Sequence, residues 1–245
     1  MSLLSDYEQR TAWKYEPLQG LFHTHAGLAN KVNPDGSYAP FSGSTVVFKP
    51  DNNCLRFIQQ IQSMLYQKLD PSDMLASFLP TSTIHMTLHD LISPEMCTAA
   101  SEDEYRYEIS DSLNKAVAIV EEIRRDYTGR KITMVPDRIV NMVSKSLVLL
   151  LRPQTEQNYE LLEELYHRFD RIQNLPYPLL PHITLAYYKP GMLDGTILGE
   201  AVDFAQIKPE NALVFEFSPN GLTVQRFFDM QNYMDIPGED YVDEN

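Results

Sequence analysis

Tetrapeptides of the form His-apolar-Thr-apolar occur twice in the chain, starting at His85 and at His182. Both lie in stretches typical of β-strands, where side chains two residues apart point to the same face. His85 would then share a face with Thr87, and His182 with Thr184, while the apolar residues enter a core. Two such strands side by side would frame a pocket with two imidazoles and two hydroxyls.

Imidazole suits general acid–base catalysis because its pKa, about 6.5, lies close to working pH. One neutral histidine would remove a proton from the attacking oxygen of a phosphate ester, and one protonated histidine would supply a proton to the leaving oxygen. The threonines would donate hydrogen bonds to nonbridging phosphoryl oxygens. The motifs do not say whether His85 or His182 is the base, and the scheme requires no metal.

One further residue is expected at this pocket. In a regular strand, Tyr188 shares the face of His182 and Thr184, where it would stack on a base or contact phosphate. Strand alternation also places His89 on the face of His85 and Thr87.

Each motif ends a similar series of elements. A β-branched or leucine-rich strand, a basic residue with proline (Lys49-Pro50 or Arg152-Pro153) and a helical pattern precede each motif strand. The repeat predicts two related units, at about residues 44–90 and 146–188, each with one motif strand. The fold class expected is therefore α+β and bilobal, with two antiparallel sheets facing a central cleft and helices outside.

Other elements follow from periodicity and turn signals. Ser218-Pro219-Asn220-Gly221 is a turn sequence that predicts a hairpin between two final strands. The expected elements are a short helix within residues 1–20, strands at 21–28, 44–48, 131–140, 146–151, 212–217 and 222–227, and helices at 51–69, 101–127 and 154–169.

The domain organisation predicted is simple. Residues 1–20 would form a helical extension and residues 21–235 a single bilobal domain. The acidic residues 236–245 would form a solvated tail.

Composition restricts the partners. The chain has 20 Lys and Arg against 34 Asp and Glu, a net charge of −14. A protein that binds duplex DNA or long RNA needs many cations to displace counterions, so a small phosphate ester, a nucleotide or an RNA terminus is the expected partner. No apolar run long enough to span a membrane and no signal peptide is apparent, and there are only two cysteines. We expect a cytoplasmic monomer.

The paired motif strands resemble the two-histidine phosphoesterase superfamily, which includes LigT-like RNA ligases and cyclic phosphodiesterases. The stretches 41–47, 85–88 and 181–187 more narrowly resemble an uncharacterised branch of it, and the likeness covers roughly residues 20 to 230. The resemblance implies that His85 and His182 are the acid–base pair and that Thr87 and Thr184 bind phosphate. It also implies metal-independent reactions, without a cofactor, on RNA termini, 2′,3′-cyclic phosphates or related nucleotide cyclic phosphates.

Two other hypotheses remain open. The pocket would also suit a non-catalytic module that binds nucleotides or RNA ends. Alternatively, His23 and His25, spaced as in some metal sites, would join His85 and His89 in a metallohydrolase.

Overall fold

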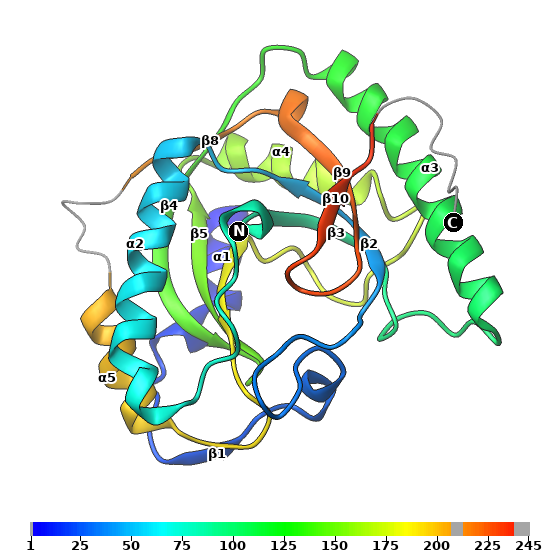
Figure 1. Cartoon of the computed structure of the whole chain (residues 1–245). Helices are drawn as coiled ribbons and strands as arrows, with labels where there is room; N and C mark the ends of the chain where they lie inside the picture. The colour runs from blue at the N-terminus through cyan, green and yellow to red at the C-terminus, as the bar shows by residue number, and fades with distance from the viewer. Residues whose placement is uncertain (1, 207–212, 238–245) are drawn as a thin grey trace.

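The fold is organised around an antiparallel sheet made of two four-stranded halves. The computed structural model describes residues 2–206 and 213–237, and its sheet has the order β10-β9-β2-β3-β6-β5-β4-β8 (Figure 1). The halves meet at one residue pair, Met86 of β3 with Ile183 of β6. The first half contains β10 (Tyr233–Asp235), β9 (Leu222–Phe227), β2 (Gly43–Phe48) and β3 (Met86–Ile92); the second contains β6 (His182–Tyr187), β5 (Ser146–Pro153), β4 (Ile132–Met142) and β8 (Phe215–Phe217). A second, two-stranded sheet pairs β1 (Leu21–His23) with β7 (Met192–Asp194).

The same strand–helix–strand order occurs in both halves. β2, α2 (Asn52–Leu69) and β3 follow one another in the first, and β5, α4 (Glu156–His167) and β6 in the second. In each, the two strands are antiparallel neighbours. The strand order on one side of the β3–β6 contact therefore mirrors the order on the other, and the predicted α+β bilobal fold is confirmed.

Helix starts are set by side-chain caps. Asp51, Ser101 and Thr155 each accept a hydrogen bond from a backbone N–H three residues later, at the starts of α2, α3 (Glu102–Asp126) and α4. These caps satisfy N–H groups that have no partner within the helix. The predicted helix positions agree with the observed ones to within a few residues.

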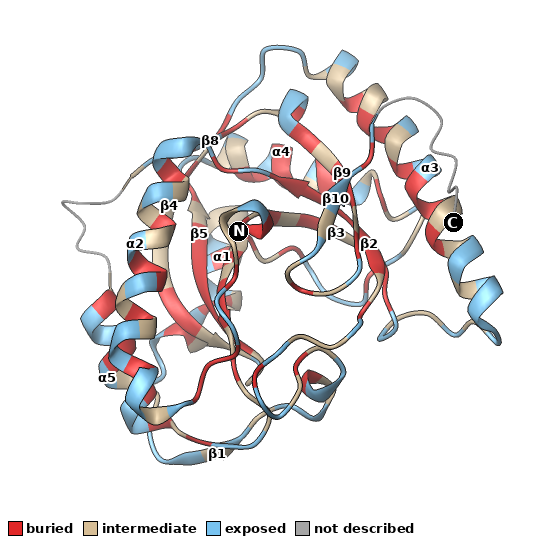
Figure 2. Cartoon of the chain, in the orientation of Figure 1, coloured by how far each residue is buried: buried red, intermediate tan, exposed pale blue. Residues whose placement is uncertain are grey.

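The core lies between the sheet and the helices. Leu147, Leu149 and Leu151 of β5 belong to the main core, whereas Val148 and Leu150 point to the opposite face of the sheet and form a smaller cluster. Figure 2 shows buried residues along the strands and exposed residues on the outer sides of α2, α3 and α5 (Gly195–Ala205). None of the described helices is long and apolar enough to cross a lipid bilayer.

The N-terminal segment covers part of that opposite face. It consists of α1 (Leu3–Arg10) and a 3₁₀ turn, η1 (Ala12–Tyr15). The side chain of Lys14 is fully buried, with Nζ 2.8 Å from Glu8 Oε2 and 2.6 Å from Asp137 Oδ2. Trp13 packs on the smaller cluster beside Lys14. A buried charge without partners would be costly, so this ion pair fixes the segment against β4.

Two predicted features are wrong. Only residues 21–23 of the expected 21–28 strand pair with another strand, because a 3₁₀ turn, η2 (Ala26–Asn30), follows. The last two strands do not form a hairpin: the η6 turn (Pro219–Gly221) carries the chain from β8, which pairs with β4, to β9, which pairs with β2 and β10. Ala212 of the expected strand and residues 238–245 of the expected acidic tail lie outside the described residues.

Candidate active site

The contact between β3 and β6 brings the two motifs together. Met86 and Ile183 are paired and fully buried in the core. Continuing this antiparallel register by one residue each way sets His85 opposite Thr184 and Thr87 opposite His182, with all four on the face away from the core. Directly opposite residues have Cβ atoms about 5 Å apart and diagonal neighbours about 7–8 Å apart. The two imidazoles are such diagonal neighbours.

A small cavity opens on this face. It has a volume of about 20 Å³ and is lined by residues of both halves and of the segment around β10: Leu79, Thr83, His85, Thr184, Tyr187, Met230 and Tyr233. A larger cavity, of about 470 Å³, lies at the outer edge of β4 and contains none of the four motif residues. Of the four motif residues, His85 and Thr184 line the small cavity, whereas His182 and Thr87 are not among its lining residues. The small cavity is therefore the candidate site.

A backbone carbonyl two residues earlier in the chain lies beside each histidine ring. His182 Nδ1 donates a hydrogen bond to the Leu180 carbonyl at 2.7 Å. A carbonyl only accepts, so Nδ1 carries the hydrogen and Nε2 is free for the reaction. The Thr83 carbonyl occupies the equivalent position beside His85 and raises its pKa, although His85 Nδ1 falls short of a full hydrogen bond.

Burial controls the charge of both rings. The pKa of His85 is lowered to about 4, mainly by burial and to a smaller extent by His182 and Lys49, whereas Thr83 and Asp90 oppose the shift. Burial also lowers the pKa of His182, whereas the Leu180 carbonyl and Asp90 raise it by a smaller amount. Both imidazoles are therefore neutral at pH 7 in the empty site.

Both motif strands carry a β-bulge directly after the threonine. In the pairing of β3 with β2, Leu88 is the extra residue, and in the pairing of β6 with β5 it is Leu185. An extra residue disrupts the regular alternation of a strand. Simple strand alternation therefore does not give the face on which the residues beyond each bulge lie.

The bulge at Leu185 corrects the expectation for Tyr188. Tyr187, not Tyr188, lines the cavity, where it hydrogen-bonds with Thr184. Tyr188 is 0 % exposed, and its ring contacts Phe22 edge-on in the core. Tyr188 therefore does not reach the site.

The bulge at Leu88 corrects the expectation for His89. Its ring is buried between Tyr166 and Phe169, with Nε2 3.4 Å from Asp170 Oδ1. Asp90 turns toward the site instead, and its charge raises the pKa of both His85 and His182. Asp90 Oδ2 also accepts a hydrogen bond from Tyr177 at 3.0 Å.

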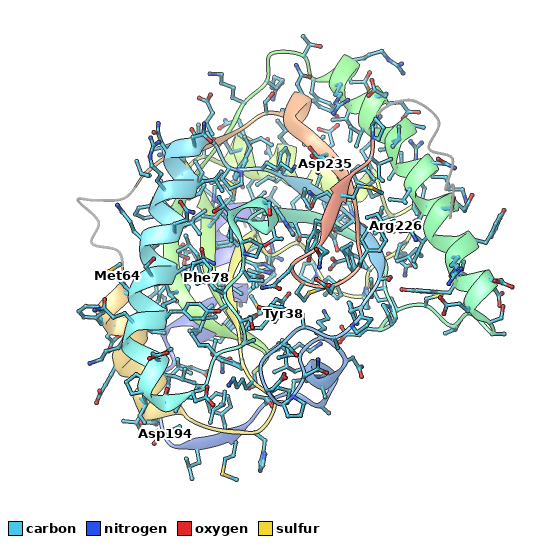
Figure 3. The ribbon with its side chains drawn as sticks, viewed as in Figure 1. Tyr38, Met64, Phe78, Asp194, Arg226 and Asp235 are labelled. Atoms are coloured by element: carbon cyan, nitrogen blue, oxygen red, sulfur yellow. The ribbon has the colours of Figure 1, made fainter. Side chains whose placement is uncertain are left out.

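Sequence reasoning missed three residues of the site: Asp90, Tyr187 and Tyr233. The ring of Tyr233, from β10, lies 5.1 Å from the His85 ring. No motif marks β10, because its position follows from pairing with β9 far along the chain. Figure 3 shows Asp235, also of β10, above Tyr38, whose ring contacts Tyr187.

The residues of the metal hypothesis are not brought together. His25 accepts a hydrogen bond from the backbone of Gly27, and His89 is enclosed in the core. Within residues 2–206 and 213–237, no three His, Cys, Asp or Glu side chains are grouped as ligands for a metal ion.

Comparison with known proteins identifies the fold. No family model and no curated protein matches the sequence. A conserved protein of unknown function, ATU0111 from Agrobacterium tumefaciens str. C58, is 16% identical with a TM-score of 0.54, over 88% of this chain and 93% of that one. LigT from E. coli, solved in complex with 3′-AMP, is 14% identical with a TM-score of 0.50, over 80% of this chain and 96% of that one. The protein therefore has a LigT-like fold, in agreement with the expected fold class.

Proposed function

We propose that this protein is a phosphoesterase that opens a cyclic phosphodiester by acid–base catalysis with His85 and His182, without a metal ion. The observation that supports the proposal is the register of β3 and β6, from which His85 lies opposite Thr184 and Thr87 opposite His182 on one face of the sheet. The LigT-like fold supports a phosphoesterase of this kind.

The reaction balances with one water molecule. One imidazole takes a proton from water as its oxygen bonds to phosphorus. The bond from phosphorus to a ribose oxygen breaks, and that oxygen takes the proton from the second, protonated imidazole. The product is a nucleoside monophosphate, and proton exchange with solvent restores both rings. Thr87 and Thr184 donate hydrogen bonds to the nonbridging oxygens, where negative charge increases in the transition state.

The surroundings of the two rings support different roles for them. Lys49 and His182 both disfavour a proton on His85, so His85 is the base. His182 has a full hydrogen bond from Nδ1 to Leu180 and the carboxylate of Asp90 nearby, and both favour its cation. His182 is therefore the acid. The negative phosphodiester, once bound between the rings, raises the pKa of His182 and helps it to hold the proton.

The substrate we propose is a 2′,3′-cyclic nucleotide, a related nucleotide cyclic phosphate or an RNA end. The net charge of −14 disfavours a long nucleic acid. The LigT structure was solved with 3′-AMP, and a nucleoside 3′-phosphate is one product of opening a 2′,3′-cyclic phosphate.

A direct test is turnover of the four 2′,3′-cyclic nucleotides in excess chelator. His85→Ala and His182→Ala should each abolish most turnover, whereas His167→Ala, an exposed histidine of α4, should retain it. Hydrolysis that requires added metal would overturn the proposed mechanism. Tight binding of cyclic nucleotides without turnover would instead identify a binding module.

A further inference from the structure

Two lysines share one carboxylate on the Tyr187 side of the candidate site. Glu95, just after β3, lies between Lys145 in the β4–β5 turn and Lys31 after η2. Lys145 Nζ is 3.0 and 3.2 Å from the two oxygens of Glu95, and Lys31 Nζ is 3.6 Å from Oε2. Both lysine side chains are 18% exposed, so the three groups, here called the two-lysine cluster, form a partly enclosed site rather than a solvated surface pair.

Backbone contacts connect the cluster to the catalytic pocket. The Lys145 carbonyl accepts a hydrogen bond from the N–H of Tyr188, and the next residue, Ser146, pairs with Tyr187. The carbonyl of Lys31 accepts from Ala39, beside Tyr38. The rings of Tyr38 and Tyr187 meet edge to face, with centroids 6.0 Å apart. Tyr187 lines the cavity that holds His85. Burial raises the pKa of Tyr187 and the charge of Glu95 contributes to this shift, so the cluster lies near the tyrosine that borders the cavity.

The charge of the cluster differs from that of other ion pairs near the site. Lys49 pairs with Asp235 and Lys189 with Asp73, each at 2.5 Å, so each cation has its own carboxylate. In the cluster, two ammonium groups face one carboxylate, which leaves an excess of one positive charge. Each ammonium has three N–H donors, and Lys31 also lies over the Phe41 ring at 4.5 Å, which holds it in place.

We propose that the two-lysine cluster binds a second phosphate group of the substrate, one that the histidines do not cleave. The inference rests on the proposed function. It narrows the substrate class to nucleotides that carry a 2′,3′-cyclic phosphate and a second phosphate at the 5′ position. The lysines bind the phosphate oxygens through N–H donors that Glu95 leaves unused. Glu95 holds the lysines together when the site is empty and opposes an anion when it is filled.

The test compares two substrates that differ by one phosphate. The wild-type kcat/KM for a 5′-phosphorylated nucleoside 2′,3′-cyclic phosphate should exceed that for the unphosphorylated nucleoside 2′,3′-cyclic phosphate by about tenfold, the size of a charge-assisted hydrogen bond. Lys145→Met should remove this preference, and Glu95→Gln should increase it through a lower KM. Lys115→Met, an exposed lysine of α3, is the matched control and should leave the preference unchanged. A dinucleotide with a terminal cyclic phosphate distinguishes an RNA phosphodiester from a free 5′-phosphate.

Binding measurements separate the two proposals. Calorimetry with a nucleoside 3′,5′-bisphosphate and a nucleoside 3′-phosphate needs no turnover, and the bisphosphate should bind about tenfold more tightly. Preferential binding without hydrolysis would overturn the proposed function and keep the subsite. Equal affinity for the two ligands would overturn the subsite. So would equal losses of kcat/KM on both substrates in the folded Lys145→Met variant. Either result would leave the phosphoesterase proposal standing.

Discussion

The motif strands β3 and β6 have a β-bulge at the same position, but they direct different side chains toward the site after that bulge. Each contains the Thr-Leu of its motif, and in each the leucine is the extra residue of a β-bulge. Two residues beyond that leucine, β3 turns Asp90 toward the site and β6 turns Tyr187. The pseudo-symmetric frame thus supplies equivalent histidines and threonines, whereas the positions after the bulge supply different side chains, a carboxylate in one strand and a phenol in the other.

The largest effects should come from the histidines, and they can break this comparison. His85→Ala and His182→Ala should each lower kcat on a 2′,3′-cyclic nucleotide by about 10³-fold. On a nitrophenyl phosphodiester, the leaving group needs no proton. With this substrate, the loss of kcat relative to wild type should be far smaller for His182→Ala than for His85→Ala. Equal losses for the two variants on both substrates would contradict the assignment of His182 as the acid.

Substitution of the motif threonines should have the next largest effect on kcat, and the effect should be equal in the two strands. Thr87→Val and Thr184→Val keep the shape of the side chain but remove the donor to the phosphoryl oxygen. Each should lower kcat by about 10²-fold, measured at saturating substrate. Thr223→Val on β9 is a control on the same sheet. A loss at only one of the two motif threonines would show that the phosphate binds in one lobe.

The carboxylate of Asp90 should set the pH range of activity. The base His85 must be neutral, so kcat/KM rises as pH increases through about 4. The acid His182 must be protonated, so kcat/KM falls as pH increases through its lowered pKa. The maximum should therefore lie below pH 6.5. Because Asp90 raises both pKa values, Asp90→Asn should move both limbs of the pH–rate profile to lower pH. An unchanged profile would show that Asp90 does not act on the histidines. Asp111→Asn on α3 is the control.

The smallest effects should separate the adjacent tyrosines. Tyr187→Phe removes a hydroxyl at the cavity and should raise KM by about three- to tenfold. Tyr188→Phe should leave kinetics unchanged and not lower the melting temperature, because the Tyr188 hydroxyl is buried without a hydrogen-bond partner. Higher KM in Tyr188→Phe alone would show that the bulge at Leu185 does not persist in solution.

Local patterns in the sequence predicted most of the fold. The helices α2, α3 and α4 have clear apolar periodicity and a capping residue at the start, and both signals lie within one segment. The pairing of the two motifs was also predictable, because two tetrapeptides of the same form mark it. The failures involve contacts between segments. A bulge depends on the neighbouring strand, so Tyr188 and His89 were placed on the wrong face, and the separate partners of β8 and β9 cannot be read from the turn that joins them.

The position of Trp13 gives the protein a built-in optical probe. It is the single tryptophan of the chain and packs beside Leu180 on the cluster of Val140, Val148 and Leu150, and Leu150 pairs with His182. Intrinsic emission therefore reports on one place, the docking of the N-terminal segment on the lobe that holds the second histidine. Detachment of that segment would change the emission of Trp13, so a denaturation curve followed by fluorescence, compared with one followed by circular dichroism, would reveal whether the segment unfolds before the rest.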